Sequence, residues 1–150
     1  MELLQAIERR TSVRRFKDKP VELEDLKEIV RRAGLAPSVN NSQQWKFIVV
    51  TKKEAIQELA ELVRNKIHDL FPNAPDKVRS TVEYFSTIFE KAPTLLLIAQ
   101  QPYDAVADDM LHEKLTHDML NQLRGYPDVQ SIGAAVENIL LSAVDLGYGA

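Results

Sequence analysis

The sequence contains no cysteine among its 150 residues. This absence excludes disulfide bonds, cysteine nucleophiles, cysteine-ligated zinc and iron–sulfur clusters. The sequence also lacks a long apolar run, because the strongest one, Leu95–Ala99, is far too short to span a bilayer. The first ten residues include Glu2 and Glu8 and have no apolar core, so they are not typical of a signal peptide. We therefore expect a cytoplasmic protein that is not a membrane partner.

There is no excess of basic residues either. The net charge is -3, which argues against nucleic acid as the main partner, since phosphate binding needs a basic face. The glycine-rich fingerprint of dinucleotide folds, the phosphate-binding loop of NTPases and the nucleophile elbow of hydrolases are all missing. With 45% hydrophobic and 27% charged residues, the chain has the composition of one ordinary globular domain.

The apolar pattern predicts helices interleaved with a few strands, an α+β (mixed α/β) fold. Apolar residues recur at helical spacing within segments 3–7, 23–33, 53–69, 78–89, 110–123 and 128–146. Phe47–Val50 and Thr94–Ala99 are unbroken apolar runs that predict two buried strands. Asp128 is expected to cap the last helix, Gly147 to end it, and a third strand to begin at Tyr148. Since so small a sheet is hard to complete within one chain, we expect oligomerisation or further sequence.

One motif resembles a metal site. The run from His112 through Glu113 to His117 is similar to a zinc-protease motif, but its histidines are five positions apart. On a helix they would point about 140° apart and could not share one ion. We interpret them, together with His68 and Asp108–Asp109, as solvated surface positions, and we expect no metal.

Two polar stretches interrupt the helical pattern. The first, Arg9–Phe16, holds four arginines and a serine. Arginine suits bidentate phosphate recognition, and a serine hydroxyl adds a donor beside it. The alternative interpretation is a solvated basic loop that pairs with Glu8 or Asp18.

The second stretch, Ala36–Trp45, places short amides and hydroxyls directly before a predicted strand. Such groups can donate to the carbonyls and ring nitrogens of a planar heterocycle. The alternative is an ordinary turn, because proline, serine and asparagine favour turns. Neither stretch alone decides between these interpretations.

Their combination resembles the nitroreductase family. Arg-x-Ser-x-Arg-x-Phe from Arg10, then Ala-Pro-Ser-x-x-Asn-x-Gln-x-Trp from Ala36, is similar to the family pattern. The small residues from Ser131 and the end at Gly149 are similar to its long core helix. The resemblance implies a helix-flanked central sheet and a domain-entwined homodimer with FMN at the subunit interface.

The resemblance also implies eight cofactor-binding residues. Arg10, Thr11 and Ser12 would bind the FMN phosphate and ribityl end, and Arg14 would lie near the N1 edge of the flavin. The other four are Pro37, Ser38, Val39 and Asn41. This second group would reach the flavin held mainly by the other subunit. No acid–base residue is implied as catalytic, because the flavin carries the chemistry.

The implied activity is an FMN-dependent oxidoreductase that transfers hydride from NADH or NADPH to a nitroaromatic, a quinone or a similar small acceptor. A dehalogenase or flavin-consuming enzyme of the same fold is an alternative, and it would need a lid, for which Asn65–Glu83 is the candidate. Another alternative is a degenerate flavin-binding scaffold without turnover.

The sequence departs from the family pattern at two places. Position 44 is Gln, where the family usually has proline, which predicts a more flexible loop. The sequence ends at Ala150, where family members continue into a strand, a flavin-contacting loop and a C-terminal arm. We expect residues 1–150 to form one nitroreductase-like domain without those parts, and to bind FMN more weakly than a longer relative.

Overall fold

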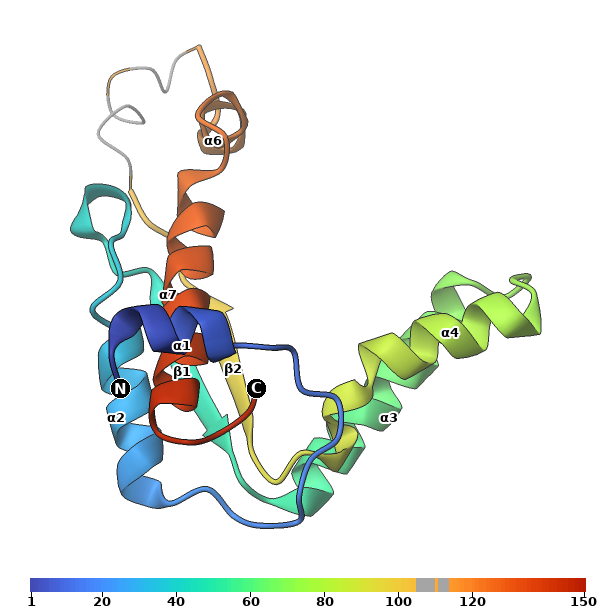
Figure 1. The fold of residues 1–150 in the computed structure, drawn as a ribbon. Coiled ribbons are helices and arrows are strands. Elements are labelled where there is room, and N and C mark those ends of the chain that lie inside the picture. The colour runs from blue at the N-terminus through green and yellow to red at the C-terminus, as the bar shows by residue number, and fades with distance from the viewer. Residues whose placement is uncertain (105–109, 111–113) are drawn as a thin grey trace.

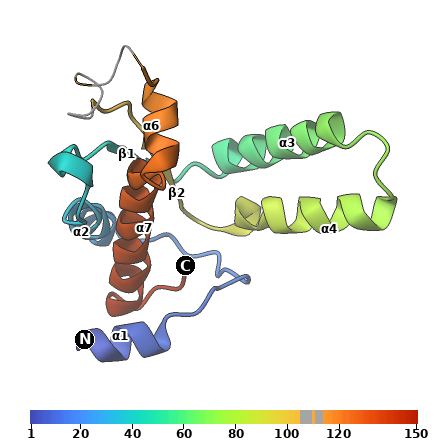
Figure 2. The ribbon, with the colours of Figure 1, turned by 90° about the horizontal axis from the view of Figure 1, so that it is seen from above.

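The computed structural model describes residues 1–104, 110 and 114–150. The elements are α1 (Leu3–Arg9), α2 (Leu23–Ala33), η1 (Val39–Asn41), β1 (Trp45–Val50), α3 (Lys53–Leu70), α4 (Asp76–Ser86), η2 (Ile88–Lys91), β2 (Leu95–Gln100), α6 (His117–Leu123) and α7 (Pro127–Asp145). Helices α1, α2 and α7 gather around the strands, and a hairpin of α3 and α4 projects away from them (Figures 1 and 2). The α+β fold class is confirmed.

The described residues contain one sheet of two antiparallel strands, β1 and β2. Its register runs from Trp45 opposite Gln100 to Val50 opposite Leu95. Both predicted strands are present, but the expectation that they are buried is wrong. Ile48 in β1 is 40% exposed, and no residue of β2 is buried. The physical reason is that two strands alone leave the outer edges and part of one face without a neighbour.

Helix α7 lies at the centre of the molecule and packs along α2 (Figure 1). Small residues make the close approach possible, because Ala33 on α2 and Ala135 on α7 are fully buried. Ala135 also belongs to a cluster with Ala36 and Trp45, against which Phe47 packs. This cluster joins the helical layer to the start of β1.

Helix α1 forms where predicted, but its apolar stripe does not face the core. Leu3, Leu4 and Ile7 are exposed, and Ala6 is the buried residue of the helix. Three large apolar side chains on one short helix are therefore left on the surface of the single chain.

The last helix begins one residue earlier than predicted, at Pro127. Proline suits the first helical position because its missing N–H needs no partner there. Asp128 is consequently not the cap. Its carboxylate accepts a hydrogen bond from the Gln100 side chain instead. Gly147 does end the helix, with a left-handed φ of 86°.

No strand forms at Tyr148 in the described chain, where a third strand was expected. The segment instead runs beside the residues after α1, and the Ala150 carbonyl accepts from the Val13 amide at 2.9 Å.

Helix α3 of the projecting hairpin contains Ile56, the largest fully buried side chain of the described residues. An Arg64–Glu90 ion pair and a 3.0 Å contact between His68 and Glu83 join its helices. The helix predicted over 78–89 is interrupted at Thr87, which separates α4 from η2.

The helix predicted over 110–123 is described only in part. Helix α6 starts at His117, and residues 111–113 lie outside the described residues, as do Asp108 and Asp109. Of the helices in the ranges described, none combines the length and apolar character that a membrane crossing needs.

Candidate functional site

The first polar stretch leaves α1 in an extended conformation and meets the opposite end of the chain. Arg10 is the C-cap of α1, with φ -61° and ψ 120°. Arg9, Thr11 and Val13 line a shallow pocket of about 210 Å³ together with Gly147 and its neighbours. A Cβ atom on Gly149 would lie 2.5 Å from Val13 Cγ2, so this close approach requires glycine.

The arginines of this stretch have no carboxylate partners in the part of the chain that the structure describes. None of Arg9, Arg10, Arg14 and Arg15 forms an ion pair there, and Arg14 donates only to the neighbouring Val13 carbonyl at 3.1 Å. Asp18 lies 3.7 Å from Lys53 instead. The interpretation that these arginines pair with Glu8 or Asp18 is therefore wrong, and their guanidinium groups remain available for an anion.

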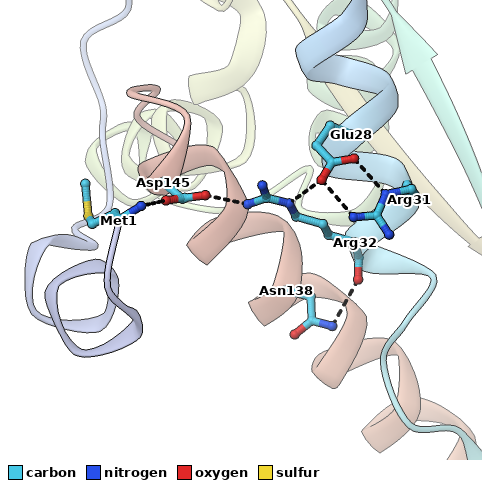
Figure 3. Close-up of polar contacts among 6 residues, drawn as sticks. All are labelled: Met1, Glu28, Arg31, Arg32, Asn138 and Asp145. Carbon is cyan, nitrogen blue, oxygen red and sulfur yellow. Dashed lines mark hydrogen bonds and ion pairs between the residues drawn. The ribbon is translucent and has the colours of Figure 1, made fainter.

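A chain of ion pairs at the end of α7 holds the helix that precedes the first polar stretch (Figure 3). Arg32 on α2 donates to Asp145 at 2.6 Å and to Glu28 at 2.7 Å. The Met1 ammonium contacts the other oxygen of Asp145 at 2.5 Å. The Met1 ammonium and then Arg32 hold the pKa of Asp145 below its usual value. These contacts fix α1, and with it the start of the first polar stretch, against α2 and α7.

The second polar stretch lies at the other end of α7 and has an unusual backbone. Asn40, Asn41 and Gln43 all have a left-handed φ, of 51°, 54° and 46° respectively. The loop is held by the Ser38 hydroxyl, which accepts from the Gln43 amide at 2.9 Å. The Val39 amide donates to the Ser131 hydroxyl on α7 at 3.0 Å. Non-glycine residues with positive φ persist only where several contacts enforce them, and they concentrate at functional sites.

Gln44 is buried and bonded, which corrects the expectation that it makes this loop flexible. Its side chain is 2% exposed, and its Nε2 donates to the Asp128 carbonyl at 3.2 Å. The predicted site residues did not include Gln44, its partner Asp128 or Gln100, which donates to Asp128. No spacing rule in the sequence brings together positions so far apart.

The structure does not bring the two predicted groups of cofactor-binding residues together within one chain. Arg10, Ser12 and Arg14 follow α1 beside the end of α7, whereas the loop of Ser38 contacts α7 near its start (Figure 1). From Ser131 to the end of α7 at Asp145 the helical rise amounts to about 21 Å. Each end of the helix therefore carries half of the predicted set.

Metal binding has no support among the residues described. Residues 1–104, 110 and 114–150 contain no cluster of three histidine or acidic side chains that could hold an ion. His112 and Glu113 lie outside them, and His117 packs edge-on against the Tyr103 ring. His68 lies at the surface as predicted, in contact with Glu83.

Comparison with known proteins decides the family. The profile of the nitroreductase family matches residues 7–150. The chain belongs to the nitroreductase family. The resemblance of its two polar stretches to that family is thus confirmed, whereas the roles of individual residues are not tested by the match.

Two relatives support this assignment. A protein of Archaeoglobus fulgidus, named provisionally as an NADH dehydrogenase/NAD(P)H nitroreductase, is 30% identical over 148 residues, which cover 99% of this chain and 64% of the relative. A BluB-like flavoprotein from Clostridium difficile 630 is 32% identical, with a TM-score of 0.82 over 99% of this chain and 72% of the other. The chain spans less than two thirds of the length of the curated nitroreductase relatives that it matches.

A third nitroreductase-fold structure is an oxidised iodotyrosine deiodinase bound to FMN and 3-iodo-L-tyrosine. It is 24% identical, with a TM-score of 0.66, and the match covers 99% of this chain and 72% of the deiodinase. At that identity the likeness shows the shared fold alone.

Proposed function

We propose that this protein is an FMN-dependent oxidoreductase that takes hydride from NADH or NADPH and passes it to a nitroaromatic, a quinone or a similar small acceptor. The observation that carries the proposal is the group of four arginines without ion-pair partners in the described chain. They lie beside Ser12 on the segment where the nitroreductase family motif begins. A free guanidinium cluster next to hydroxyl donors suits the phosphate of a flavin nucleotide.

The residues at both ends of α7 fit FMN. Arg10, Thr11 and Ser12 supply donors for the phosphate and ribityl chain. Arg14 supplies positive charge for the N1 edge of the flavin ring, where reduction leaves negative charge. Bound FMN would supply the hydride-accepting chemistry itself. The left-handed loop supplies the second group of contacts, from Pro37, Ser38, Val39 and Asn41.

The proposed assembly is a homodimer with FMN at the subunit interface. The separation of the two groups along α7 supports it, because a flavin between two subunits can take the first group from one chain and the second group from the other. Leu3, Leu4 and Ile7 leave an apolar surface on α1, and Gly133 leaves open space on α7. Apolar surface of this kind is typical of subunit interfaces.

A dehalogenase is the second candidate, favoured by the shared fold of the FMN-bound deiodinase. Its lid would be the candidate segment Asn65–Glu83, which the structure places at the projecting end of the α3–α4 hairpin (Figure 2). Incubation with FMN, a reductant and 3-iodo-L-tyrosine separates the two candidates, since only a dehalogenase releases iodide.

A visible absorption spectrum of the purified protein tests the proposal. We expect a flavin band, native or restored by added FMN, that is lost when NADH or NADPH is added without oxygen. Return of the band on addition of a quinone would complete the turnover. A protein that stays colourless with added FMN refutes the cofactor, and a flavin that no nicotinamide reduces identifies a scaffold without turnover.

A further inference from the structure

Gln44 is the most heavily bonded buried side chain at the second polar stretch. Its Oε1 accepts from the Ser42 hydroxyl at 2.6 Å, and its Nε2 donates to the Asp128 carbonyl at 3.2 Å. Its own backbone carbonyl accepts from the Gln101 amide at 2.6 Å. The residue thus joins the loop to the start of α7 and to the segment after β2.

Asp128 is fixed in turn. Asp128 is 5% exposed, and its Oδ2 accepts a hydrogen bond from the Gln100 side chain at the end of β2. Asp128 therefore accepts a hydrogen bond from Gln44 at its backbone carbonyl and another from Gln100 at its side chain. Buried amides bonded on both sides define a single geometry, because each lost partner leaves a polar atom unsatisfied.

This anchor lies next to the left-handed residues of the loop. Gln43, directly before Gln44, has a φ of 46°. Left-handed backbone is unfavourable for a non-glycine residue, so it relaxes where the surrounding contacts are lost. A proline at position 44 would add a second conflict, since proline favours an extended backbone with negative φ in the residue before it.

We propose that Gln44 is a positioning residue that holds the loop of residues 38–43 in its flavin-binding shape before the cofactor binds. The inference rests on the proposed function, because the loop is assigned there to the flavin. In this chain, hydrogen bonds from a buried glutamine replace the proline that the family usually carries before tryptophan. The glutamine is what permits Gln43 its left-handed backbone, so restoring the family residue weakens the site rather than strengthening it.

The test compares the full chain with Gln44→Met, which keeps the volume but loses both amide bonds, and with Gln44→Pro. Gln57→Met, at an exposed position on α3, is the matched control. Amide hydrogen exchange of residues 38–43 is measured without cofactor, and FMN affinity is measured by quenching of flavin fluorescence. Thermal melts show that each variant is folded at the temperature used.

We expect both Gln44 variants to raise the FMN dissociation constant about tenfold, as the loss of one or two net hydrogen bonds predicts, and to speed exchange in the loop. Gln57→Met should behave like the parent chain. If Gln44→Met does not fold, Ser42→Ala removes one of the bonds and should change both quantities in the same direction by a smaller factor.

Faster exchange with unchanged FMN affinity would overturn the proposal, because it would leave Gln44 a structural role only. Unchanged exchange would also overturn it. A parent chain that binds no FMN refutes the proposed function instead, and the exchange data then still decide whether Gln44 holds the loop.

Discussion

The Tyr148 hydroxyl donates a 2.6 Å hydrogen bond to the Asp25 carboxylate, which ties the segment after α7 to the first turn of α2. The same segment contacts Val13 in the first polar stretch. The bond to Asp25, followed by burial, raises the pKa of Tyr148 above the usual 10.0, because it favours the neutral phenol.

Tyr148 should therefore ionise at a higher pH than an unperturbed tyrosine. A raised pKa in the folded chain means that the bond stabilises the fold fully below about pH 10, and that the contribution is lost as pH rises through the folded pKa. Near-ultraviolet absorbance during alkaline titration measures this, and Tyr148→Phe should remove a step above about pH 10. Removal of a step at lower pH would contradict the assignment.

The ion pairs of Glu28 predict how the stability of the fold changes at acid pH. Its bonds to Arg31 and then Arg32 lower the pKa of its carboxyl from 4.5 to about 2. A lowered pKa means that the stabilisation is present above pH 4.5 and lost as pH falls toward about 2. We expect Glu28→Gln to lower the melting temperature at neutral pH and to flatten its dependence on pH across this window.

Glu24 supplies the matched control for that experiment, because it pairs with Lys27 on the exposed side of the same helix. Glu24→Gln should leave the acid limb of the stability curve close to that of the parent chain, as exposed pairs contribute little. Equal acid limbs for the parent chain and Glu28→Gln would show that the two ion pairs of Glu28 drawn in Figure 3 do not stabilise the fold.

Substitution of two arginines in the first polar stretch should separate the effect on FMN binding from the effect on flavin reduction. Arg10→Ala should weaken FMN binding by roughly ten- to a hundredfold, since it removes a charge-assisted bond to phosphate. Arg14→Ala should slow flavin reduction by NADH or NADPH more than it weakens binding. Flavin titration and anaerobic stopped-flow absorbance measure the two quantities.

Arg15→Ala is the control, because it removes one charge of the same cluster at an exposed position to which no contact with FMN is assigned. A loss of binding alone in Arg14→Ala would count against the placement of Arg14 at the flavin N1 edge.

Gly133 tests the proposed dimer. A Cβ added there meets nothing within 4 Å, so a larger residue fits the single chain. Gly133→Leu should raise helix stability by about 0.8 kcal/mol and at the same time block close approach of a second subunit. Sedimentation should show a dimer for the parent chain and for Gly133→Ala, and a monomer for Gly133→Leu. A dimer that survives Gly133→Leu would place the interface elsewhere.

The sequence predicted the elements well where periodicity alone decides them. The segments that became α2 and α3 carry an apolar face at helical spacing, and Pro72 and Pro75 mark the turn of the hairpin. Periodicity states that a face is apolar and not what covers it. Leu3 belongs to the apolar face of α1 and lies exposed.

The candidate site was predictable only in its local motifs. Arg10 and Ser38 belong to short patterns that can be read along the chain, whereas Gln44 and Asp128 meet only through the packing of β1 against α7. The left-handed backbone of Gln43 was equally hidden, because glutamine has no special preference for it. Contacts across such sequence distances follow from the fold and not from spacing.

The placement of the two polar stretches at opposite ends of α7 has a genetic consequence. In the proposed dimer, every flavin site combines the Arg10 end of one subunit with the Ser38 end of the other. A chain damaged at Arg10 and a chain damaged at Ser38 would each be inactive alone, yet their mixed dimer concentrates both defects in one site and leaves the other whole. Co-expression of two inactive alleles should then restore about a quarter of the sites.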